Sequence, residues 1–246
     1  MTVHRYDAPF FDFVDASSGR SAQAFLERLD LGFEPRSVLD VGCGRGAWLA
    51  AWRRRGVADT VGVDGAWVDP ATLQIPRSAF VVADLTRPID VGRRFDLVEC
   101  LEVAEHLPEA AADGLVASLV RHGDVVLFSA ATPGQGGEFH VNEQPLSYWI
   151  ARFARAGYAA FDGPRAAVQG VGDIEPWYRY NALLFASAAG AERLSPEVRR
   201  AELPPGVAPR EYAPLAWRLR ARVLGALPQR WVHHLARLKH RLVRRG

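Results

Sequence analysis

The sequence has almost no lysine and little cysteine. Lys239 is the one lysine among 30 Lys plus Arg residues, and we interpret this first as a bias of genomic base composition. Cys43 and Cys100 are the two cysteines, too few for the disulfide framework of a small secreted domain. A reducing interior is therefore favoured over secretion, and we expect a cytoplasmic protein.

Long apolar runs are also missing. No uninterrupted apolar stretch reaches the roughly 18 residues that a membrane-spanning helix needs, so no transmembrane helix is expected. Residues 1–15, MTVHRYDAPFFDFVD, carry charges where a secretory signal has its apolar centre, so no signal peptide is expected. No internal repeat is present.

The net charge of +2 hides an asymmetry along the 246 residues. Residues 191–246 hold 13 Lys plus Arg against 4 Asp plus Glu, whereas residues 1–190 hold 17 against 24. An acidic body therefore carries a basic tail. The length predicts one large domain, or one domain plus an appendage, and the 49% hydrophobic content is enough for a substantial core.

Short apolar segments alternate with helical patterns along the body. We expect strands at 37–42, 60–65, 79–85, 95–101, 124–130, 158–163 and 180–188, and helices at 46–56, 109–123 and 145–157. This alternation is typical of an α/β fold with a mostly parallel sheet that helices cover on both faces.

The character changes after residue 188. Residues 189–246 begin as a Pro-rich linker and continue as a basic amphipathic tail of about two helices, broken at Pro228. Three interpretations of the tail stay open. It packs on the body or on a second subunit of a homodimer, it lies on an anionic membrane surface, or it contacts nucleic acid.

A glycine-rich turn, VLDVGCGRGAW, joins the first expected strand to the first helix after it. A phosphate loop would need Gly-Lys-Ser/Thr, and a nicotinamide site normally has Gly-x-Gly-x-x-Gly, and neither is present. Acidic residues Asp40, Asp64 and Asp84 stand near the carboxyl ends of the first three strands, where open α/β sheets bind ligands. These features suit S-adenosylmethionine, with Asp64 accepting from the ribose hydroxyls and Asp84 from the adenine amine.

Glu102, Glu105 and His106 are spaced i, i+3 and i+4, so on a helix they would share one face. In one interpretation this is the start of a solvated helix, whose N-terminus favours acidic residues. In the other, two carboxylates and an imidazole hold a metal ion.

Four segments in this order, VLDVGCGRG, VGVD, VVADL and FDLVECLEVAEHL, resemble the class I S-adenosylmethionine-dependent methyltransferases over residues 21–188. The resemblance implies a Rossmann-like, seven-stranded sheet with the last strand antiparallel, and an N-terminal segment, 1–20, that covers the cofactor. The residues implied in cofactor binding are Asp40, Gly42, Cys43, Gly44, Gly46, Asp64, Gly65, Asp84, Leu85 and Leu101.

Two subfamilies share the Glu-x-x-Glu-His pattern at residues 102–106. The ubiquinone-biosynthesis O-methyltransferases have it, and the small-RNA 2′-O-methyltransferases have it with a later histidine, which the segment His140-Val-Asn-Glu143 resembles. This resemblance implies four metal ligands, Glu102, Glu105, His106 and His140. Such ligands suit Mn, Fe, Co or Zn better than Mg, which prefers oxygen ligands.

Catalysis is expected at Glu102, His106 and His140. A metal would lower the pKa of a substrate hydroxyl and orient it, whereas without metal His140 is the expected general base. One imidazole cannot serve in both ways. Gln135, Asn142 and Glu143 are candidate substrate contacts, as are Trp177 and Tyr178, although the first group could equally order the loop and the aromatic pair could pack on the sheet.

The first functional hypothesis is an O-methyltransferase for a hydroxyl of a small molecule, a sugar or a glycan. The second is an RNA 2′-O-methyltransferase, against which the acidic body and the lack of a dedicated RNA-binding domain argue. The third is a non-catalytic binding module, against which the retained cofactor motifs argue.

Overall fold

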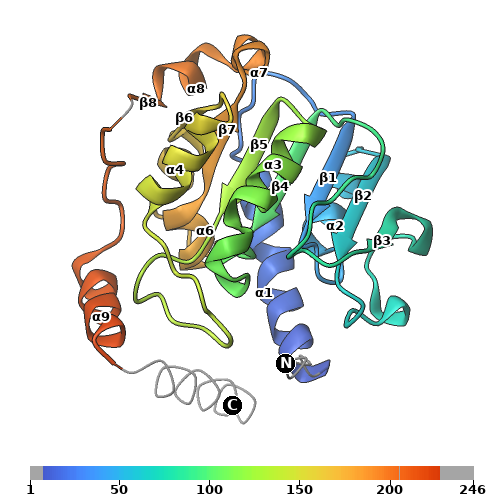
Figure 1. The fold of residues 1–246 in the computed structure, drawn as a ribbon, viewed down its shortest axis with the longest axis horizontal. Helices are drawn as coiled ribbons and strands as arrows, with labels where there is room; N and C mark the ends of the chain where they lie inside the picture. Colours follow the sequence, from blue (N-terminus) through green and yellow to red (C-terminus); the bar gives the residue numbers. More distant parts are fainter. Residues whose placement is uncertain (1–7, 205, 228–246) are drawn as a thin grey trace.

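The computed structural model describes residues 8–204 and 206–227, and an eight-stranded sheet organises them (Figure 1). The strand order is β3-β2-β1-β4-β5-β7-β6-β8. The strands are β1 (Ser37–Val41), β2 (Asp59–Asp64), β3 (Phe80–Val82), β4 (Leu97–Leu101), β5 (Val125–Ser129), β6 (Ala159–Phe161), β7 (Leu183–Ala186) and β8 (Glu202–Leu203).

Strands β1 to β5 pair in parallel, and β7 is antiparallel to both of its neighbours, β5 and β6. The expected α/β fold and its antiparallel last strand are therefore confirmed. The expected count of seven strands is wrong by one. Two residues of the region interpreted as a linker, Glu202 and Leu203, pair with β6 and extend the sheet beyond the seven.

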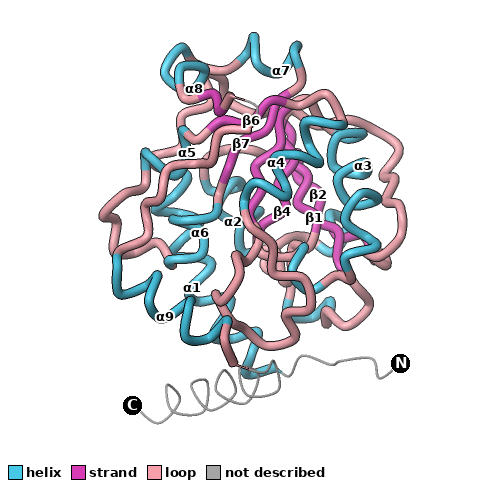
Figure 2. Tube along the Cα trace, turned by 60° about the vertical axis from the view of Figure 1, so that its left-hand side comes forward, coloured by secondary structure: helices cyan, strands magenta, loops and turns pink. Residues whose placement is uncertain are grey.

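Helices cover both faces of the sheet, as expected (Figures 1 and 2). The helices α3 and α4 cross one face and pack on a cluster that includes Val98, Phe128 and Trp149. The opposite face carries α1, α2 and α6 over a cluster that includes Phe25, Trp52 and Leu127. The bounds are α1 (Ala8–Leu26), α2 (Ala47–Arg54), α3 (Ala112–His122), α4 (Leu146–Arg155), α5 (Gly163–Ala167) and α6 (Pro176–Asn181).

The three helices expected at 46–56, 109–123 and 145–157 are confirmed as α2, α3 and α4. A 3-10 turn, Glu109–Ala111, precedes α3. The strand expected from residue 180 begins later, at Leu183, because α6 continues through Asn181. The proline at the first turn of α6 fixes a helical φ there, which stabilises a short helix ahead of the strand.

The appendage after β7 contains α7 (Ala188–Arg193), α8 (Pro196–Arg200) and α9 (Leu215–Gly225). Leu215, Leu219 and Val223 on α9 are exposed. The helix expected after Pro228 lies outside the described residues, so the three interpretations of the tail stay predictions. Within residues 8–204 and 206–227, no helix is long and apolar enough to cross a membrane.

Helix α1 runs continuously through residue 20, where the sequence had suggested the end of a covering segment. Its second half packs on α2 and α6. The Ser18 hydroxyl lies 3.0 Å from the Tyr178 hydroxyl, and Ser21 Oγ accepts from the Glu175 amide at 3.0 Å. The covering role of residues 1–20 stays a prediction, and residues 1–7 lie outside the described part.

Two carboxyl groups are buried next to each other in the sheet. Asp40 on β1 is in register with Glu99 on β4. Trp52 Nε1 donates to Glu99 Oε2 at 2.9 Å, while Glu99 Oε1 has no hydrogen-bond partner among the described residues. Burial raises the pKa of Glu99 to about 8, and burial together with the charge of Glu99 raises the pKa of Asp40. Glu99 is therefore mostly protonated at neutral pH.

This predicts that Glu99 makes the fold less stable as pH rises. The folded-state pKa lies above the unfolded value of about 4.3, so its stabilising contribution is complete below that value and is lost between it and about pH 8. The slope is at most about 1.4 kcal/mol per pH unit. Glu99→Gln keeps an acceptor for Trp52 and cannot ionise, so its unfolding free energy in urea should depend less on pH between 5 and 8.

Glu27→Gln, at an exposed position on α1's C-terminal side, is the matched control and should follow the native curve. If the Glu99→Gln curve instead runs parallel to the native curve, Glu99 does not titrate in this range and the assignment of its neutral form is wrong.

Candidate active site

The glycine-rich turn after β1 is held by backbone hydrogen bonds to β2. Gly42 has a positive φ of 87°, and its amide donates to the Val63 carbonyl at 2.7 Å. A Cβ at Gly42 would collide with the side chain of Val103, which lies just beyond β4. Glycine is therefore required here both for the backbone conformation and for the close approach of the turn to the end of β4.

Asp64 ends β2 and faces the glycine-rich turn. Its carboxylate accepts from the amides of Gly44 at 2.7 Å and Gly65 at 2.6 Å. Burial raises the pKa of Asp64 to about 6, and hydrogen bonds from Gly65, Gly44 and Trp67 oppose that rise. The group is thus an ionised hydrogen-bond acceptor at neutral pH, as binding of a ribose diol requires.

Trp67 is a neighbour of this acceptor that sequence reasoning missed. A Cβ on Gly65 would collide with the Trp67 ring, and 41% of Trp67 is exposed. The ring therefore lies on Gly65 and presents an apolar surface beside Asp64. The signal was an aromatic residue three positions after the strand-ending acid, which is weak by itself.

Asp84 follows β3 and is exposed. Thr86 donates to it from its hydroxyl at 2.7 Å and from its amide at 3.0 Å, and these hydrogen bonds lower the pKa of Asp84. Three more of the expected cofactor residues, Cys43, Leu85 and Leu101, are buried. Gly46 has a φ of 86° and is the N-cap of α2. The expected cofactor residues thus gather at the carboxyl ends of β1 to β4.

The segment after β4 is not the helical face that the spacing predicted. Glu102 has a left-handed φ of 56°, and a single 3-10 turn, Ala104–His106, follows it. The Glu102 amide donates to the Ser129 carbonyl at 3.0 Å, which extends the pairing of β4 with β5 by one residue. The chain then bends sharply, so Glu102 does not share a helical face with Glu105 and His106.

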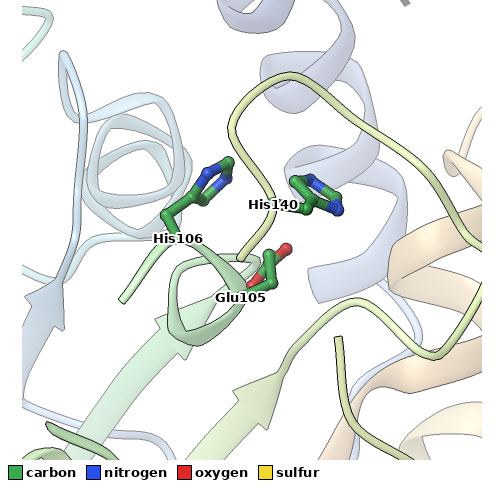
Figure 3. Close-up of side chains that lie close together, drawn as sticks. All are labelled: Glu105, His106 and His140. Carbon is green, nitrogen blue, oxygen red and sulfur yellow. The ribbon is translucent and has the colours of Figure 1, made fainter. Parts of the chain in front are cut away.

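Glu105, His106 and His140 do come together (Figure 3). Each offers a ligand atom, and these atoms lie within 4.8 Å of one another. The two imidazole rings are 4.9 Å apart and nearly perpendicular. His140 lies on the loop after β5. Backbone hydrogen bonds position this loop, because the Glu105 carbonyl accepts from the amides of Val141 at 2.8 Å and Asn142 at 3.0 Å.

Burial determines the charge of this cluster. It raises the pKa of Glu105 well above its usual value, with the charge of Glu102 adding to the effect. Burial and the neighbouring His140 lower the pKa of His106 to about 3, so that imidazole is neutral. Glu105 Oε2 has no hydrogen-bond partner within the described chain. The neutral imidazole of His106 is the form that binds a divalent cation, and a cation would bind Glu105 by displacing the proton that its raised pKa favours, so the donor set fits one.

His140 is oriented by a carboxylate from its own loop. Its Nδ1 lies 2.8 Å from Glu143 Oε1, and Glu143 also accepts from the amides of Gly134 and Gly136, each at 2.8 Å. Burial alone would raise the pKa of Glu143, but the hydrogen bond from His140 and the two amides lower it. In this structure Glu143 orders the loop, and its expected contact with substrate stays a prediction.

Glu102 belongs to a separate amide network. Gln135 Nε2 donates to Glu102 Oε2 at 2.6 Å, and Asn181 Nδ2 lies 3.3 Å from Glu102 Oε1 and 2.8 Å from Gln135 Oε1. The carboxyl group of Glu102 is therefore directed toward Gln135 and Asn181. Asn181 was missed because it lay at the start of an expected strand, where no motif singled it out.

The other candidate substrate contacts lie in different surroundings. Asn142 is buried, and its side chain accepts from Gln144 at 3.0 Å. Tyr178 is buried in the core with its ring edge-on to Trp48, at 5.0 Å between centroids. Trp177 is partly buried and packs against the same cluster. The structure thus places Asn142 beside Glu105, Gln135 beside Glu102, and Tyr178 in the core.

Relatives of known name match part of the chain. A ubiquinone biosynthesis O-methyltransferase of Alkalilimnicola ehrlichii is 36% identical over 131 residues, which are 49% of this chain and 47% of that protein. The corresponding protein of Neisseria meningitidis serogroup C is 34% identical over 122 residues, 46% of this chain and 47% of that protein. The chain spans about half the length of these curated relatives.

Solved structures share the fold at low identity. An O-methyltransferase family protein of Burkholderia thailandensis has a TM-score of 0.56 at 16% identity, covering 72% of this chain and 58% of that one. The sugar N-methyltransferase KedS8 of Streptoalloteichus has a TM-score of 0.53 at 17% identity, covering 76% and 95%. At this identity the likeness shows the fold alone.

The family model described as "Methyltransferase domain" matches residues 15–165, which is more than half of the 246-residue chain. This confirms the resemblance that the four sequence motifs carry. The chain belongs to the methyltransferase-domain family, within the class I S-adenosylmethionine-dependent methyltransferases.

Proposed function

We propose that this chain transfers a methyl group from S-adenosylmethionine to a hydroxyl of a small molecule, sugar or glycan. One observation carries the proposal. Gly42 of the cofactor turn lies against Val103, and Val103 directly precedes the turn that bears Glu105 and His106. The cofactor turn and the largely buried Glu-His-His cluster are therefore adjacent, as a methyl donor and a site for activating its acceptor must be.

Two features support binding of S-adenosylmethionine at the glycine-rich turn, namely carboxylates that can accept hydrogen bonds and open space beside the turn. Asp64 offers an ionised carboxylate for the ribose hydroxyls, and Trp67 offers an apolar ring surface beside it. Gly44, with a φ of 54°, leaves room for a ligand because a Cβ there would meet no atom within 4 Å. Asp84 supports the adenine contact, since it is exposed and ionised at the next strand end.

The acceptor side must make a hydroxyl a better nucleophile. A divalent metal bound by Glu105, His106 and His140 would supply this by lowering the hydroxyl pKa and fixing its position. Glu102 is the fourth ligand of the proposal, and its carboxyl group would have to turn away from Gln135 and Asn181 to join. The O-methyltransferase relatives support oxygen as the acceptor atom.

A metal-free mechanism is the second candidate, and the His140–Glu143 pair favours it. Glu143 Oε1 accepts from Nδ1, so it fixes the tautomer that leaves Nε2 able to take a proton from the hydroxyl. The carboxylate also stabilises the imidazolium that results. In this case Glu105 and His106 shape the pocket, and the methyl group passes to an oxygen that loses its proton to His140 Nε2. An RNA 2′-O-methyltransferase remains the alternative in substrate class.

The first prediction concerns cofactor binding. Hydrogen bonds to a charged group contribute about 1.5–3 kcal/mol, so Asp64→Asn should weaken S-adenosylmethionine binding by roughly 10–100-fold in calorimetry. Native affinity should also fall as pH drops below about 6, because Asp64 protonates there, and the variant should lack that dependence. Asp59→Asn, at the exposed start of β2, is the control. Equal affinities for native protein and Asp64→Asn would contradict the assignment.

The second prediction concerns the metal. Titration with Co²⁺, followed by its visible absorption, should give one site per chain that Glu105→Gln and His140→Ala each abolish. Glu143→Gln should weaken the site by roughly 10–100-fold, because a carboxylate that orients a ligating imidazole has that effect. Exposed Glu109→Gln is the control. A spectrum that Glu105→Gln leaves unchanged would exclude a metal at this cluster.

The third prediction uses the space around His140. A Cβ at Gly137 would collide with His140 Nε2, so Gly137→Ala should displace the imidazole. Methyl transfer from labelled S-adenosylmethionine to a panel of polyols and catechols should fall by about as much as in His140→Ala, with cofactor affinity unchanged. Gly172→Ala is the control, since a Cβ there would meet no atom within 4 Å. Native turnover in Gly137→Ala would show that His140 has no part in either mechanism.

A further inference from the structure

A cavity of about 430 Å³ lies between the appendage that carries α9 and the part of the methyltransferase domain formed by α4, α6 and the loop after β5. Its walls are α9, the segment 208–213 that leads into α9, the end of α6 and the start of α4. In Figure 1, α9 lies at the lower left, next to the loop after β5.

The cavity adjoins the proposed catalytic site through Asn181. Asn181 lines the cavity, and its side chain lies 3.3 Å from Glu102 Oε1 and 2.8 Å from Gln135 Oε1. Thr132, another lining residue, accepts at its carbonyl from the Gln135 amide at 2.9 Å. Asn181 therefore belongs both to the lining of the cavity and to the network that holds Glu102.

The lining is cationic. Arg210, Arg218 and Arg222 line the cavity, and Glu211 is the one carboxylate among its described lining residues. Glu211 approaches Arg218 Nε to 4.0 Å at an exposed position, a contact of little energy. Arg165 also lines it, but Asp162 already neutralises this guanidinium through two hydrogen bonds of 2.6 and 2.7 Å. Three arginine charges thus face one carboxylate.

The first turn of α4 adds positive potential to the same cavity. Pro145, Leu146 and Ser147 line it. This ten-residue helix has no side-chain cap and no acidic residue in its first turn. Amide groups at such an end are available to an anion, and the helix dipole favours negative charge there. The Ser147 hydroxyl is a further donor in the lining.

Helix α9, which forms one wall of the cavity, contacts the loop after β5 that bears His140. Arg220 Nη1 donates to the Gln135 carbonyl at 2.9 Å. A Cβ at Gly134 would collide with the Ala221 carbonyl, so the helix backbone lies directly on that glycine, whose φ is 81°. Trp217 of α9 packs against Tyr180 of α6 with 5.7 Å between ring centroids, and both line the cavity. The cavity therefore combines cations with aromatic surface.

We propose that this cavity is the subsite for an anionic group, a phosphate or a carboxylate, carried by the methyl acceptor. The proposal rests on the proposed function and specifies its substrate class as an acidic rather than a neutral acceptor. Arg218 and Arg222 bind the anionic group, the first turn of α4 faces it, and the rest of the acceptor extends past Asn181 toward Glu102 and His140.

Binding of small probes tests the proposal without knowledge of the acceptor. With S-adenosylhomocysteine present and ionic strength constant, inorganic phosphate, glucose 1-phosphate, glucuronate and glucose are titrated against the native chain by ligand-observed NMR. We expect glucose 1-phosphate or glucuronate to bind at least tenfold more tightly than glucose. Which of the two binds better distinguishes a phosphate acceptor from a carboxylate acceptor.

The Arg218→Ala/Arg222→Ala double variant should weaken the anionic probe at least tenfold. The control is Arg199→Ala/Arg200→Ala on α8, which removes the same charge away from the cavity. The affinity of the single variant Arg222→Ala for the anionic probe should lie between those of the native chain and the double variant. This variant keeps the test informative if the double variant unfolds at a lower temperature. Equal binding of anionic and neutral probes, or equal loss in the two double variants, would overturn the proposal.

Cofactor affinity separates this test from that of the proposed function. S-adenosylmethionine should bind the native chain and both double variants equally, because these arginines lie on α8 and α9, at the opposite side of the molecule from β2, which ends at Asp64 (Figure 1). If the native chain fails to bind S-adenosylmethionine, the proposed methyl transfer is wrong. The affinity for the anionic probes still shows whether the cavity binds an anion.

Discussion

The carbonyl of Glu105 accepts two amides from the loop that follows β5, and the candidate site depends on that tie. Without it, the loop would be anchored by Glu143, by α9 and by the hydrogen bond of His106 to the backbone of Phe139, and His140 would lose its backbone connection to Glu105. The tie requires the 3-10 turn after β4, and that turn requires the left-handed Glu102 that ends the pairing with β5. Strand pairing therefore sets the position of the histidine pair, and the site needs β4 and β5 to be neighbours.

Burial then gives the site its chemical character. A carboxylate and an imidazole that lose solvent favour their neutral forms, and this explains why the pKa of Glu105 rises while that of His106 falls. Burying the polar atoms of these side chains lowers the stability of the fold unless each atom has a hydrogen bond or a ligand. Glu102 has that satisfaction from Gln135 and Asn181, whereas one oxygen of Glu105 does not. The contrast locates the centre of the site at Glu105.

Much of this arrangement was predictable from the sequence, for identifiable reasons. Buried strands bounded by Gly and Asp gave the sheet, and the glycine-rich turn with Asp64 indicated the cofactor edge. The reach of His140 to Glu105 and His106 followed from the neighbouring strands. The spacing of Glu102 failed as a guide because it assumed a helix, and a left-handed residue leaves no periodic signal.

Other features of the structure depend on contacts between residues far apart in the sequence, so no local sequence pattern could predict them. Strand β8 consists of two residues in a Pro-rich segment, and pairing across the sheet edge alone makes it a strand. Asn181 and the cavity arginines acquire their roles from long-range packing of α6 and α9. For Tyr178 the sequence left two interpretations open, a ligand contact or packing on the sheet, and the structure places its ring in the core.

We propose that Glu105, His106 and His140 form a divalent-cation site beside bound cofactor. Anomalous diffraction from crystals grown with Mn²⁺ and S-adenosylhomocysteine tests it most directly. We expect a peak bounded by the Glu105 carboxylate and the two imidazoles, with cofactor density along the turn at residues 42–46 and reaching Asp64. Cofactor density there with no anomalous peak at the cluster would contradict the claim.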